Sequence, residues 1–282
     1  MGEANAAGAR IGAAFARARA ERRVALVPYV MSGYPDRATS EELVLALAGA
    51  GADVIELGMP FSDPLADGAT IQHAGQVALE RGATLGETLG LVGRVATRVS
   101  APLVLMGYYN PIYNFGVERF CQHAAAAGVA GLIVPDLPPE EAEPLAEAAA
   151  RRGIELIYLV TPTSPEARIA LVASAAGKSG NGFIYCVALS GVTGARDAIS
   201  AQLPAMLGRV RAHTRLPLAV GFGISRPEHV ARIGTMADGA VVASALINAV
   251  DAAPEPERVR AAVAFFTTLA QGAALPAPAG DA

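Results

Sequence analysis

Glu56-Leu57-Gly58-Met59-Pro60-Phe61-Ser62-Asp63-Pro64-Leu65-Ala66-Asp67-Gly68 is the stretch that decides the fold, and it follows the apolar run Asp53-Val54-Ile55. A continuous apolar run that ends in Gly and Pro indicates a buried parallel strand that opens into a loop. Three carboxylates, Glu56, Asp63 and Asp67, lie at this strand end. Carboxylates are costly in a packed core and useful in an active site, so the stretch predicts a functional strand end.

Apolar runs of this kind recur along the chain and alternate with longer segments of helical period. The predicted strands are residues 25–31, 53–58, 102–108, 131–135, 154–160, 182–188, 216–221 and 239–243. The predicted helices are residues 40–51, 84–99, 117–127, 139–152, 164–175, 199–214, 226–234, a short piece near Leu246, and 256–270. Strands that are apolar throughout are buried on both faces, as in a parallel sheet covered by helices.

Eight strand–helix units in about 250 residues predict an α/β fold, a (β/α)8 TIM barrel with an extra N-terminal helix. The alternative is a doubly wound open sheet, which commonly places a GxGxxG motif after its first strand. Here that position reads Met31-Ser32-Gly33-Tyr34-Pro35-Asp36, so the barrel is preferred.

The composition favours one large domain with reduced thiols. The chain has 282 residues, of which 52% are hydrophobic and 17% charged, and this fits a single well-buried domain over residues 1–274. Residues 275–282 contain Pro276, Pro278 and Gly280 and are predicted to form a disordered tail, as are the first few residues. Cys121 and Cys186 are far apart and match no metal-ligand pattern, so we expect two free buried thiols and no metal.

The charge and hydropathy patterns argue against two classes of partner. A net charge of −4 and a pI near 5.6 argue against nucleic acid, which needs a concentrated basic face. Residues 1–23 are Ala-rich with Arg interspersed, which predicts an amphipathic helix rather than a signal peptide. No stretch has the length and apolarity of a membrane span, so a cytoplasmic location is expected.

A barrel places functional residues directly after its strands, and polar or small groups occupy several of those positions. They are Asp136 after the fourth strand, residues 190–196 after the sixth, 221–225 after the seventh and 243–245 after the eighth. The last three groups are small and Gly-rich, so their backbone N–H groups can bind a phosphate. A single glycine turn is more often plain turn chemistry, and Ser244 has the alternative role of a helix N-cap.

Five motifs together resemble the tryptophan synthase alpha chain family, in the right order over residues 24–266. The motifs are residues 56–68, Asn110-Pro111-Ile112, Pro135-Asp136-Leu137-Pro138, Ser190-Gly191-Val192-Thr193-Gly194 and Gly221-Phe222-Gly223-Ile224-Ser225. The resemblance implies a barrel lyase that cleaves indole-3-glycerol phosphate to indole and glyceraldehyde 3-phosphate by a retro-aldol reaction. It also implies that this chain has no cofactor of its own.

Two carboxylates take the catalytic roles that the resemblance implies. Glu56 matches the general acid and base, which protonates indole C3 and accepts the proton of a glycerol hydroxyl; an apolar strand end would keep it protonated near neutrality. Asp67 matches the carboxylate that accepts a hydrogen bond from the indole N–H. The alternative for Glu56 is a structural role at the barrel rim. Asp63, between the two, is expected to form an Asx turn with its own backbone.

The remaining site residues also follow from the resemblance. Tyr29 and Tyr185 would pack near the indole ring. The alternative interpretation is that both are structural aromatic residues of the barrel interior. Thr193, in a predicted lid over residues 190–197, would orient Asp67, and its alternative is that of an ordinary turn residue. The expected phosphate-binding residues are Gly194, Gly223, Ala243 and Ser244. The family usually has Gly at the position of Ala243. A backbone N–H survives that change, so phosphate binding is expected to persist unless the position needs a positive φ or a very close approach of the ligand.

The resemblance finally implies a partner, a tryptophan synthase beta chain that carries pyridoxal phosphate in an α2β2 assembly. The Asn110 to Asn114 loop and Pro135 to Pro138 match the docking surface, and the alternative is a loop folded on its own barrel rim. Two other functions stay open: a stand-alone indole-3-glycerol-phosphate lyase, and a non-catalytic subunit that only activates its partner.

Overall fold

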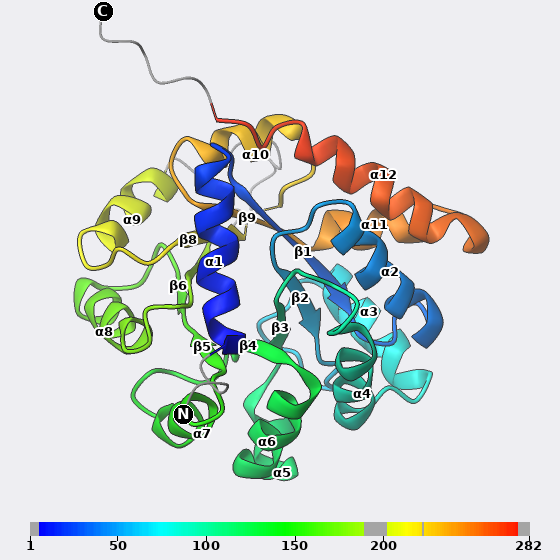
Figure 1. The fold of residues 1–282 in the computed structure, drawn as a ribbon, viewed down its shortest axis with the longest axis horizontal. Helices are drawn as coiled ribbons and strands as arrows, with labels where there is room; N and C mark the ends of the chain where they lie inside the picture. Colours follow the sequence, from blue (N-terminus) through cyan, green and yellow to red (C-terminus); the bar gives the residue numbers. More distant parts are fainter. Residues whose placement is uncertain (1–5, 189–201, 222, 276–282) are drawn as a thin grey trace, which may run out of the picture.

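The chain folds as a parallel barrel, seen end-on in Figure 1. The computed structural model describes residues 6–188, 202–221 and 223–275. In these residues nine parallel strands form one sheet in the order β5-β4-β3-β2-β1-β9-β8-β7-β6. The strands are β1 Ala25–Met31, β2 Ile55–Gly58, β3 Leu103–Met106, β4 Val129–Ile133, β5 Glu155–Ile157, β6 Leu159–Val160, β7 Ile184–Val187, β8 Leu218–Gly221 and β9 Gly239–Val242.

The barrel closes through its fifth strand, which is interrupted at Tyr158. The first piece, β5, pairs with β4, and the second piece, β6, pairs with β7. The N–H of Tyr185 on β7 donates to the Tyr158 carbonyl at 3.0 Å, so the ladder continues across the interruption. The eight predicted strands are therefore confirmed as one barrel of eight, with the fifth in two pieces.

Helices surround the barrel, and all of those predicted are found, residues 117–127 with the predicted ends and the others with shifted ends. They are α1 Ala6–Ala20, α2 Arg37–Gly49, α3 Ala69–Glu80, α4 Leu85–Val95, α5 Tyr109–Phe115, α6 Val117–Ala127, α7 Glu143–Ala150, α8 Glu166–Gly177, α9 Gln202–Arg211, α10 Pro227–Gly234, α11 Ser244–Asp251 and α12 Arg258–Ala270, with a 3-10 turn at Glu255–Glu257. Side chains set some starts: the Asp36 carboxylate accepts from the Thr39 N–H at the beginning of α2.

Two helices contradict the sequence analysis, which placed no helix at either position. Helix α3 follows Gly68 directly. Helix α5 occupies the stretch predicted as the Asn110 to Asn114 loop. Pro111 misled the prediction, because it lies in the first turn of α5, where a helix needs no backbone N–H from it.

Helix α1 closes the N-terminal end of the barrel, across which it lies in Figure 1. Its Ile11 and Phe15 are buried in the inner core of the barrel. The Phe15 ring packs on Phe183 with centroids 5.3 Å apart. A Cβ added to Gly239 would lie 2.8 Å from the Phe15 ring, so this glycine makes room for the helix. Because α1 fills this end, the site must lie at the opposite end of the strands.

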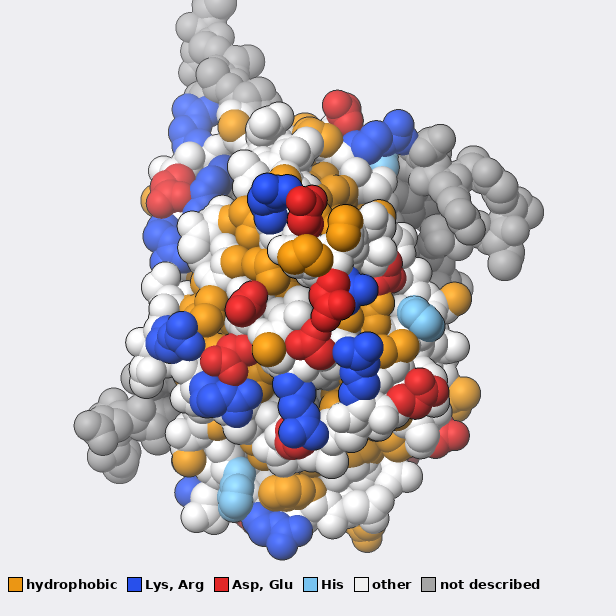
Figure 2. Space-filling model, turned by 90° about the vertical axis from the view of Figure 1, so that its right-hand side faces the viewer, with side chains coloured by type: hydrophobic (Ala, Val, Ile, Leu, Met, Phe, Trp, Pro, Cys, Tyr) orange, Lys and Arg blue, Asp and Glu red, His pale blue; other side chains and the backbone are white. Residues whose placement is uncertain are grey.

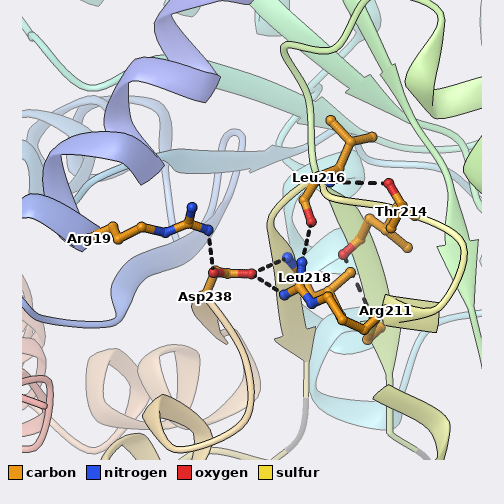
Figure 3. Close-up of polar contacts among 8 residues, drawn as sticks. Arg19, Arg211, Thr214, Leu216, Leu218 and Asp238 are labelled. Atoms are coloured by element: carbon orange, nitrogen blue, oxygen red, sulfur yellow. Dashed lines mark hydrogen bonds and ion pairs between the residues drawn. The ribbon is translucent and has the colours of Figure 1, made fainter. Parts of the chain in front are cut away.

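Two carboxylates fasten α1 to the barrel at the starts of the strands that flank β1. Asp53, before β2, forms an ion pair with Arg17 of α1 at 3.7 Å and accepts two hydrogen bonds from Arg23, which follows α1, at 2.5 and 2.8 Å. Asp238, before β9, accepts from Arg19 of α1 at 2.8 Å and from Arg211 of α9 at 2.5 Å (Figure 3). Both carboxylates thus join α1 to the starts of the strands, which stabilises the N-terminal end of the barrel, called the floor below.

The surface and the chain ends agree with several expectations. Figure 2 shows acidic and basic side chains interspersed on the face over α2, α11 and α12, with no concentration of basic groups there. No helix among the described residues is long and apolar enough to cross a bilayer. Cys121 and Cys186 are buried and free, as predicted.

The C-terminal end differs from the prediction at one residue. Leu275, which was placed in the disordered tail, donates its N–H to the Arg22 carbonyl. Residues 1–5 and 276–282 lie outside the described residues, and the single-domain boundary stays a prediction.

Candidate active site

Glu56 lies on the inner side of β2, near the carboxyl end of the strand. In the ladder it is the partner of Tyr29 on β1 and of Val104 on β3. Its side chain is 1% exposed, and neither carboxyl oxygen has a hydrogen-bond partner among the described residues. Burial, and next the charge of Asp67, raise the pKa of Glu56 to about 8. A carboxyl group in this state is protonated at neutral pH and can donate a proton.

Asp67 lies on the loop between β2 and α3. Its N–H donates to the Pro64 carbonyl at 3.0 Å, which closes a turn just before the helix. Burial raises the pKa of Asp67 to about 6, while hydrogen bonding to the Tyr108 hydroxyl opposes the rise. At neutral pH the two carboxyl groups therefore differ in state: Asp67 is largely ionised and Glu56 is largely protonated.

Tyr29 and Tyr185 are buried close to both carboxyl groups. Burial raises the pKa of each phenol well above its ordinary value, and the charges of Asp67 and Glu56 raise it further. Tyr185 belongs to the inner core of the barrel, and Tyr29 belongs to a smaller cluster with residues of α3 and α11. The structure thus brings Glu56, Asp67, Tyr29 and Tyr185 together, as the sequence analysis expected.

Two glycines make room for these tyrosines. A Cβ added to Gly58 would lie 1.9 Å from the Tyr29 hydroxyl, and one added to Gly221 would lie 2.6 Å from the Tyr185 hydroxyl. Any side chain at either position would displace a phenol from the site. Gly58 and Gly221 belong to the quoted motifs, but the sequence analysis assigned them no role.

A cavity of about 600 Å³ opens beside these residues at the carboxyl ends of the strands. Asp67 and Tyr185 line it, together with the apolar side chains of Ile71, Met106, Leu159 and Val187. This volume suits a small organic ligand, and apolar walls with few polar groups are typical of such sites. Glu56 is not among the described residues that line the cavity; it lies on β2, the strand that leads to Asp67.

The predicted phosphate-binding residues are partly described. Gly223 is exposed after β8. Ala243 is the N-cap of α11 with φ −115°, and no described side chain caps this helix. The negative φ means that the backbone at this position does not require glycine, which meets the first of the two conditions raised by the departure from the family pattern. Ser244 is the first helical residue, so its alternative role as N-cap is wrong. Thr193 and Gly194 lie outside the described residues.

A histidine that the sequence analysis missed supports the turn after β8. His229 of α10 is 7% exposed, and its Nδ1 accepts the Ser225 N–H at 3.3 Å. A buried ring that holds a turn next to Gly223 is a structural support for that loop. Its sequence signal is weak, because a lone histidine on a helix has no distinctive spacing.

The loop from Phe61 to Leu65 differs from the prediction in one bond. The Asp63 side chain accepts from the Ser62 hydroxyl, and the turn itself is closed by the Leu65 N–H and the Asp63 carbonyl at 3.0 Å. The predicted Asx turn is therefore wrong, although Asp63 remains a loop residue. Leu65 is 94% exposed, a rare position for a leucine.

The predicted docking surface is a helix and a loop that contact each other. Ile112 of α5 is fully buried and so cannot contribute to a docking surface, whereas Tyr113 is 67% exposed. The Asp136 carboxylate accepts the Tyr109 N–H at 2.9 Å, which joins the 135–138 loop to the start of α5. This contact makes the two stretches one continuous surface.

The comparison with known proteins decides the family. The sequence model of the family described as "Tryptophan synthase alpha chain" matches residues 15–274. The chain belongs to the tryptophan synthase alpha chain family. Membership confirms the predicted resemblance, and with it a lyase of tryptophan biosynthesis.

Curated members and solved structures of the tryptophan synthase family agree along nearly the whole chain. The tryptophan synthase alpha chain of Roseiflexus sp. is 53% identical over 261 residues, which are 92% of this chain and 98% of that one. That of Chloroflexus aurantiacus is 49% identical over 268 residues, 95% of this chain and 99% of that one.

The solved structures confirm the barrel. A structure of Mycobacterium tuberculosis tryptophan synthase aligns with a TM-score of 0.85 and 38% identity, covering 95% of this chain and 99% of that one. The tryptophan synthase alpha chain from Legionella pneumophila aligns with a TM-score of 0.84 and 35% identity, covering 93% of this chain and 96% of that one. Within the described parts of this family member, no three His, Cys, Asp or Glu side chains gather as metal ligands would.

Proposed function

We propose that this chain cleaves indole-3-glycerol phosphate to indole and glyceraldehyde 3-phosphate, with Glu56 and Asp67 as its catalytic residues. The observation that carries the proposal is the state of Glu56, a fully buried carboxyl group without a described hydrogen-bond partner, on which the charge of Asp67 at the wall of the cavity acts. Such a group is costly to fold, so its place at the barrel mouth supports a chemical role.

The retro-aldol reaction needs a proton at indole C3 before the carbon–carbon bond can break. Protonated Glu56 donates that proton, which gives a positively charged indolenine. The carboxylate that results accepts the proton of the adjacent glycerol hydroxyl as the aldehyde forms. The electrons of the broken bond return to the ring and restore indole, and Glu56 ends protonated again. One carboxyl group with a pKa of about 8 serves as acid and then as base.

Asp67 supplies the opposite charge. In its ionised form it accepts a hydrogen bond from the indole N–H and stabilises the positive charge that develops on the ring. Tyr29 and Tyr185 contact the ring, and the apolar cavity wall excludes water. We place the phosphate at Gly194, Gly223, Ala243 and Ser244, and we assign Thr193 the role of orienting Asp67. The uncapped N-terminus of α11 supports this placement, because its N–H groups favour an anion.

A beta chain is the proposed partner, in an α2β2 assembly. Support comes from solved complexes named tryptophan synthase and from the surface of α5 and residues 135–138, next to the exposed Tyr113 and Leu65. Pyridoxal phosphate would belong to that partner, and this chain would work in the cytoplasm without a cofactor or metal of its own. A stand-alone lyase and a non-catalytic activating subunit are the alternatives.

The proposal is tested by measuring indole release from indole-3-glycerol phosphate, with and without a beta chain. Glu56→Gln should lower turnover by roughly a hundredfold to ten-thousandfold, the usual contribution of a general acid and base. Glu155→Gln is the matched control, since Glu155 is also a buried strand glutamate but lies at the floor of the barrel, bonded to Ser179. Equal activity of wild type and Glu56→Gln would exclude the proposed role, and full activity without a beta chain would favour the stand-alone enzyme.

A further inference from the structure

Tyr108 lies directly after β3, under the loop that leads to Asp67. Its side chain is 5% exposed, and its hydroxyl accepts the Ala66 N–H at 2.9 Å. Its ring packs on Phe61 with centroids 5.3 Å apart. These two contacts lie on either side of the turn formed by residues 62–65. One side chain therefore holds both ends of the loop segment that precedes Asp67.

The backbone on each side of Tyr108 is fixed as well. The Gly107 N–H donates to the Ile133 carbonyl at 3.0 Å, and the Tyr109 N–H donates to Asp136 at 2.9 Å. A Cβ added to Gly107 would lie 2.7 Å from the Met59 side chain, so the chain here comes close to the end of β2. The backbone of Tyr108 is thus fixed by the barrel and does not depend on the loop that carries Asp67.

Asp67 is surrounded by titratable groups from four places in the barrel. Glu56 lies on β2, Tyr29 on β1, Tyr185 on β7 and Tyr108 after β3, and the charge of Asp67 acts on all four. Tyr108 is the one whose hydroxyl lowers the pKa of Asp67, against the effect of burial. It therefore favours the ionised form that the proposed mechanism requires.

The cavity separates the role of Tyr108 from that of a catalytic residue. Asp67 is among the described residues that line the cavity, whereas Tyr108 is not. The contacts of Tyr108 with the loop and its effect on Asp67 give it an indirect route to a ligand in the cavity. Asp136 is the further charged group near Tyr108, and its carboxylate is bonded to the Tyr109 N–H.

We propose that Tyr108 is a positioning residue that holds the Asp67 carboxylate at the cavity wall as a hydrogen-bond acceptor. This inference rests on the proposed function, because it specifies how one of the two catalytic carboxylates is kept in place. It adds a residue outside the cavity to the machinery of the site. The Tyr108 hydroxyl binds the loop backbone next to the Asp67 carboxylate. Residues behind a site commonly act in this way, by fixing a group that contacts the substrate.

Tyr108→Phe tests the proposal, because it removes the hydroxyl and keeps the ring on Phe61. Turnover at neutral pH should fall roughly tenfold while KM changes less than about threefold, since the interaction with Asp67 strengthens in the transition state. The acid limb of the pH–rate profile should move to higher pH, because the group that lowers the pKa of Asp67 is lost. Tyr34→Phe is the matched control: Tyr34 is a buried tyrosine bonded to the carboxylate of Asp251, and its loss should leave the profile in place.

A second measurement does not depend on catalysis. Carboxyl carbon NMR of aspartate-labelled protein gives the titration midpoint of Asp67, assigned by its absence in Asp67→Asn. Tyr108→Phe should raise that midpoint and should speed hydrogen exchange at the Ala66 amide. An unchanged midpoint together with unchanged exchange would overturn the role of Tyr108. An inactive wild type would instead contradict the proposed function alone, and the titration would still decide the question of Tyr108.

Discussion

Tyr29 on β1 and Glu56 on β2 are direct partners in the parallel ladder, so a phenol and a carboxyl group share one layer of the barrel interior. Tyr29 is 3% exposed and Glu56 is 1% exposed. Both groups are therefore shielded from water in the layer in which the proposed proton transfer occurs, and the charge of Asp67 raises the pKa of each. The predictions below follow from this layer and from the elements that hold it.

The pH dependence of turnover should be bell-shaped. Asp67 must be ionised and Glu56 protonated, and their pKa values are about 6 and about 8. Turnover should then rise through about pH 6, peak near neutrality and fall through about pH 8. A pH–rate profile under single-turnover conditions measures both limbs. A profile that stays flat from about pH 5 to about pH 9, a range that brackets both pKa values, would contradict this assignment.

Asp67→Asn should lower the pKa of Glu56. The negative charge of Asp67 raises that pKa, so its removal leaves burial as the main cause of the shift. Infrared difference titration of the Glu56 carboxyl group, assigned with Glu56→Gln, gives the value directly. The expected midpoint lies below about 8 and above the ordinary value of glutamate, about 4.3. A midpoint that rises instead would show that the two carboxyl groups do not interact as described.

Gly58→Ala should damage the site through Tyr29. The new Cβ would lie 1.9 Å from the phenol oxygen, so the ring must move. We expect a loss of about 1–3 kcal/mol in the free energy of unfolding and a higher KM. Gly93→Ala is the control: Gly93 lies in α4 with nothing within 4 Å of its added Cβ, and the change should stabilise by about 0.5–1 kcal/mol. Urea unfolding and steady-state kinetics distinguish the two variants.

Ala243→Gly should change the affinity for phosphate by less than about threefold. Ala243 has φ −115°, which any residue adopts, and the backbone N–H is present in both variants. Binding of glycerol phosphate, followed by calorimetry, measures the effect without catalysis. A gain of tenfold or more with glycine, about 1.4 kcal/mol, would mean that the alanine methyl group obstructs the ligand.

Asp238→Asn should destabilise the protein at neutral pH and much less in acid. Burial favours protonation of Asp238, but the Leu218 N–H, Arg19 and Arg211 outweigh it and lower the pKa. A lowered folded-state pKa means that the carboxylate stabilises above its unfolded pKa of about 3.9 and that this stability is lost as pH falls through the folded value. Urea unfolding of both proteins at pH 7 and pH 3 should show the gap closing. A gap of constant size would contradict the ionic origin of the contact.

The sequence predicted the parts of the fold that depend on local pattern. Apolar runs located all eight strands, and the strand-end motif located Glu56 and Asp67. Both signals depend on residues that are neighbours in the sequence, so they can be recognised without the structure. Helix α3 was missed since its small and polar residues follow a loop motif without a capping side chain. Helix α5 was missed because Asn-Pro is typical of a turn.

The supports of the site could not be predicted, because each depends on two segments far apart in the chain. Tyr108 contacts Ala66, 42 positions away, and no spacing rule connects them. Gly221 matters only because Tyr185 lies over it. The direction of such contacts is set by strand register, which a single sequence leaves undetermined.

Helix α1, with its ion pairs from Arg17 to Asp53 and from Arg19 to Asp238, occupies one end of the barrel, and the carboxylates of the site occupy the other. The molecule is thus divided along its axis into a half that tolerates engineering and a half that does not. Tighter packing or extra ion pairs at the N-terminal end would raise the melting temperature. Substrate preference could then be changed independently, at the carboxyl ends of the strands. That division makes this barrel a practical scaffold for building new lyases.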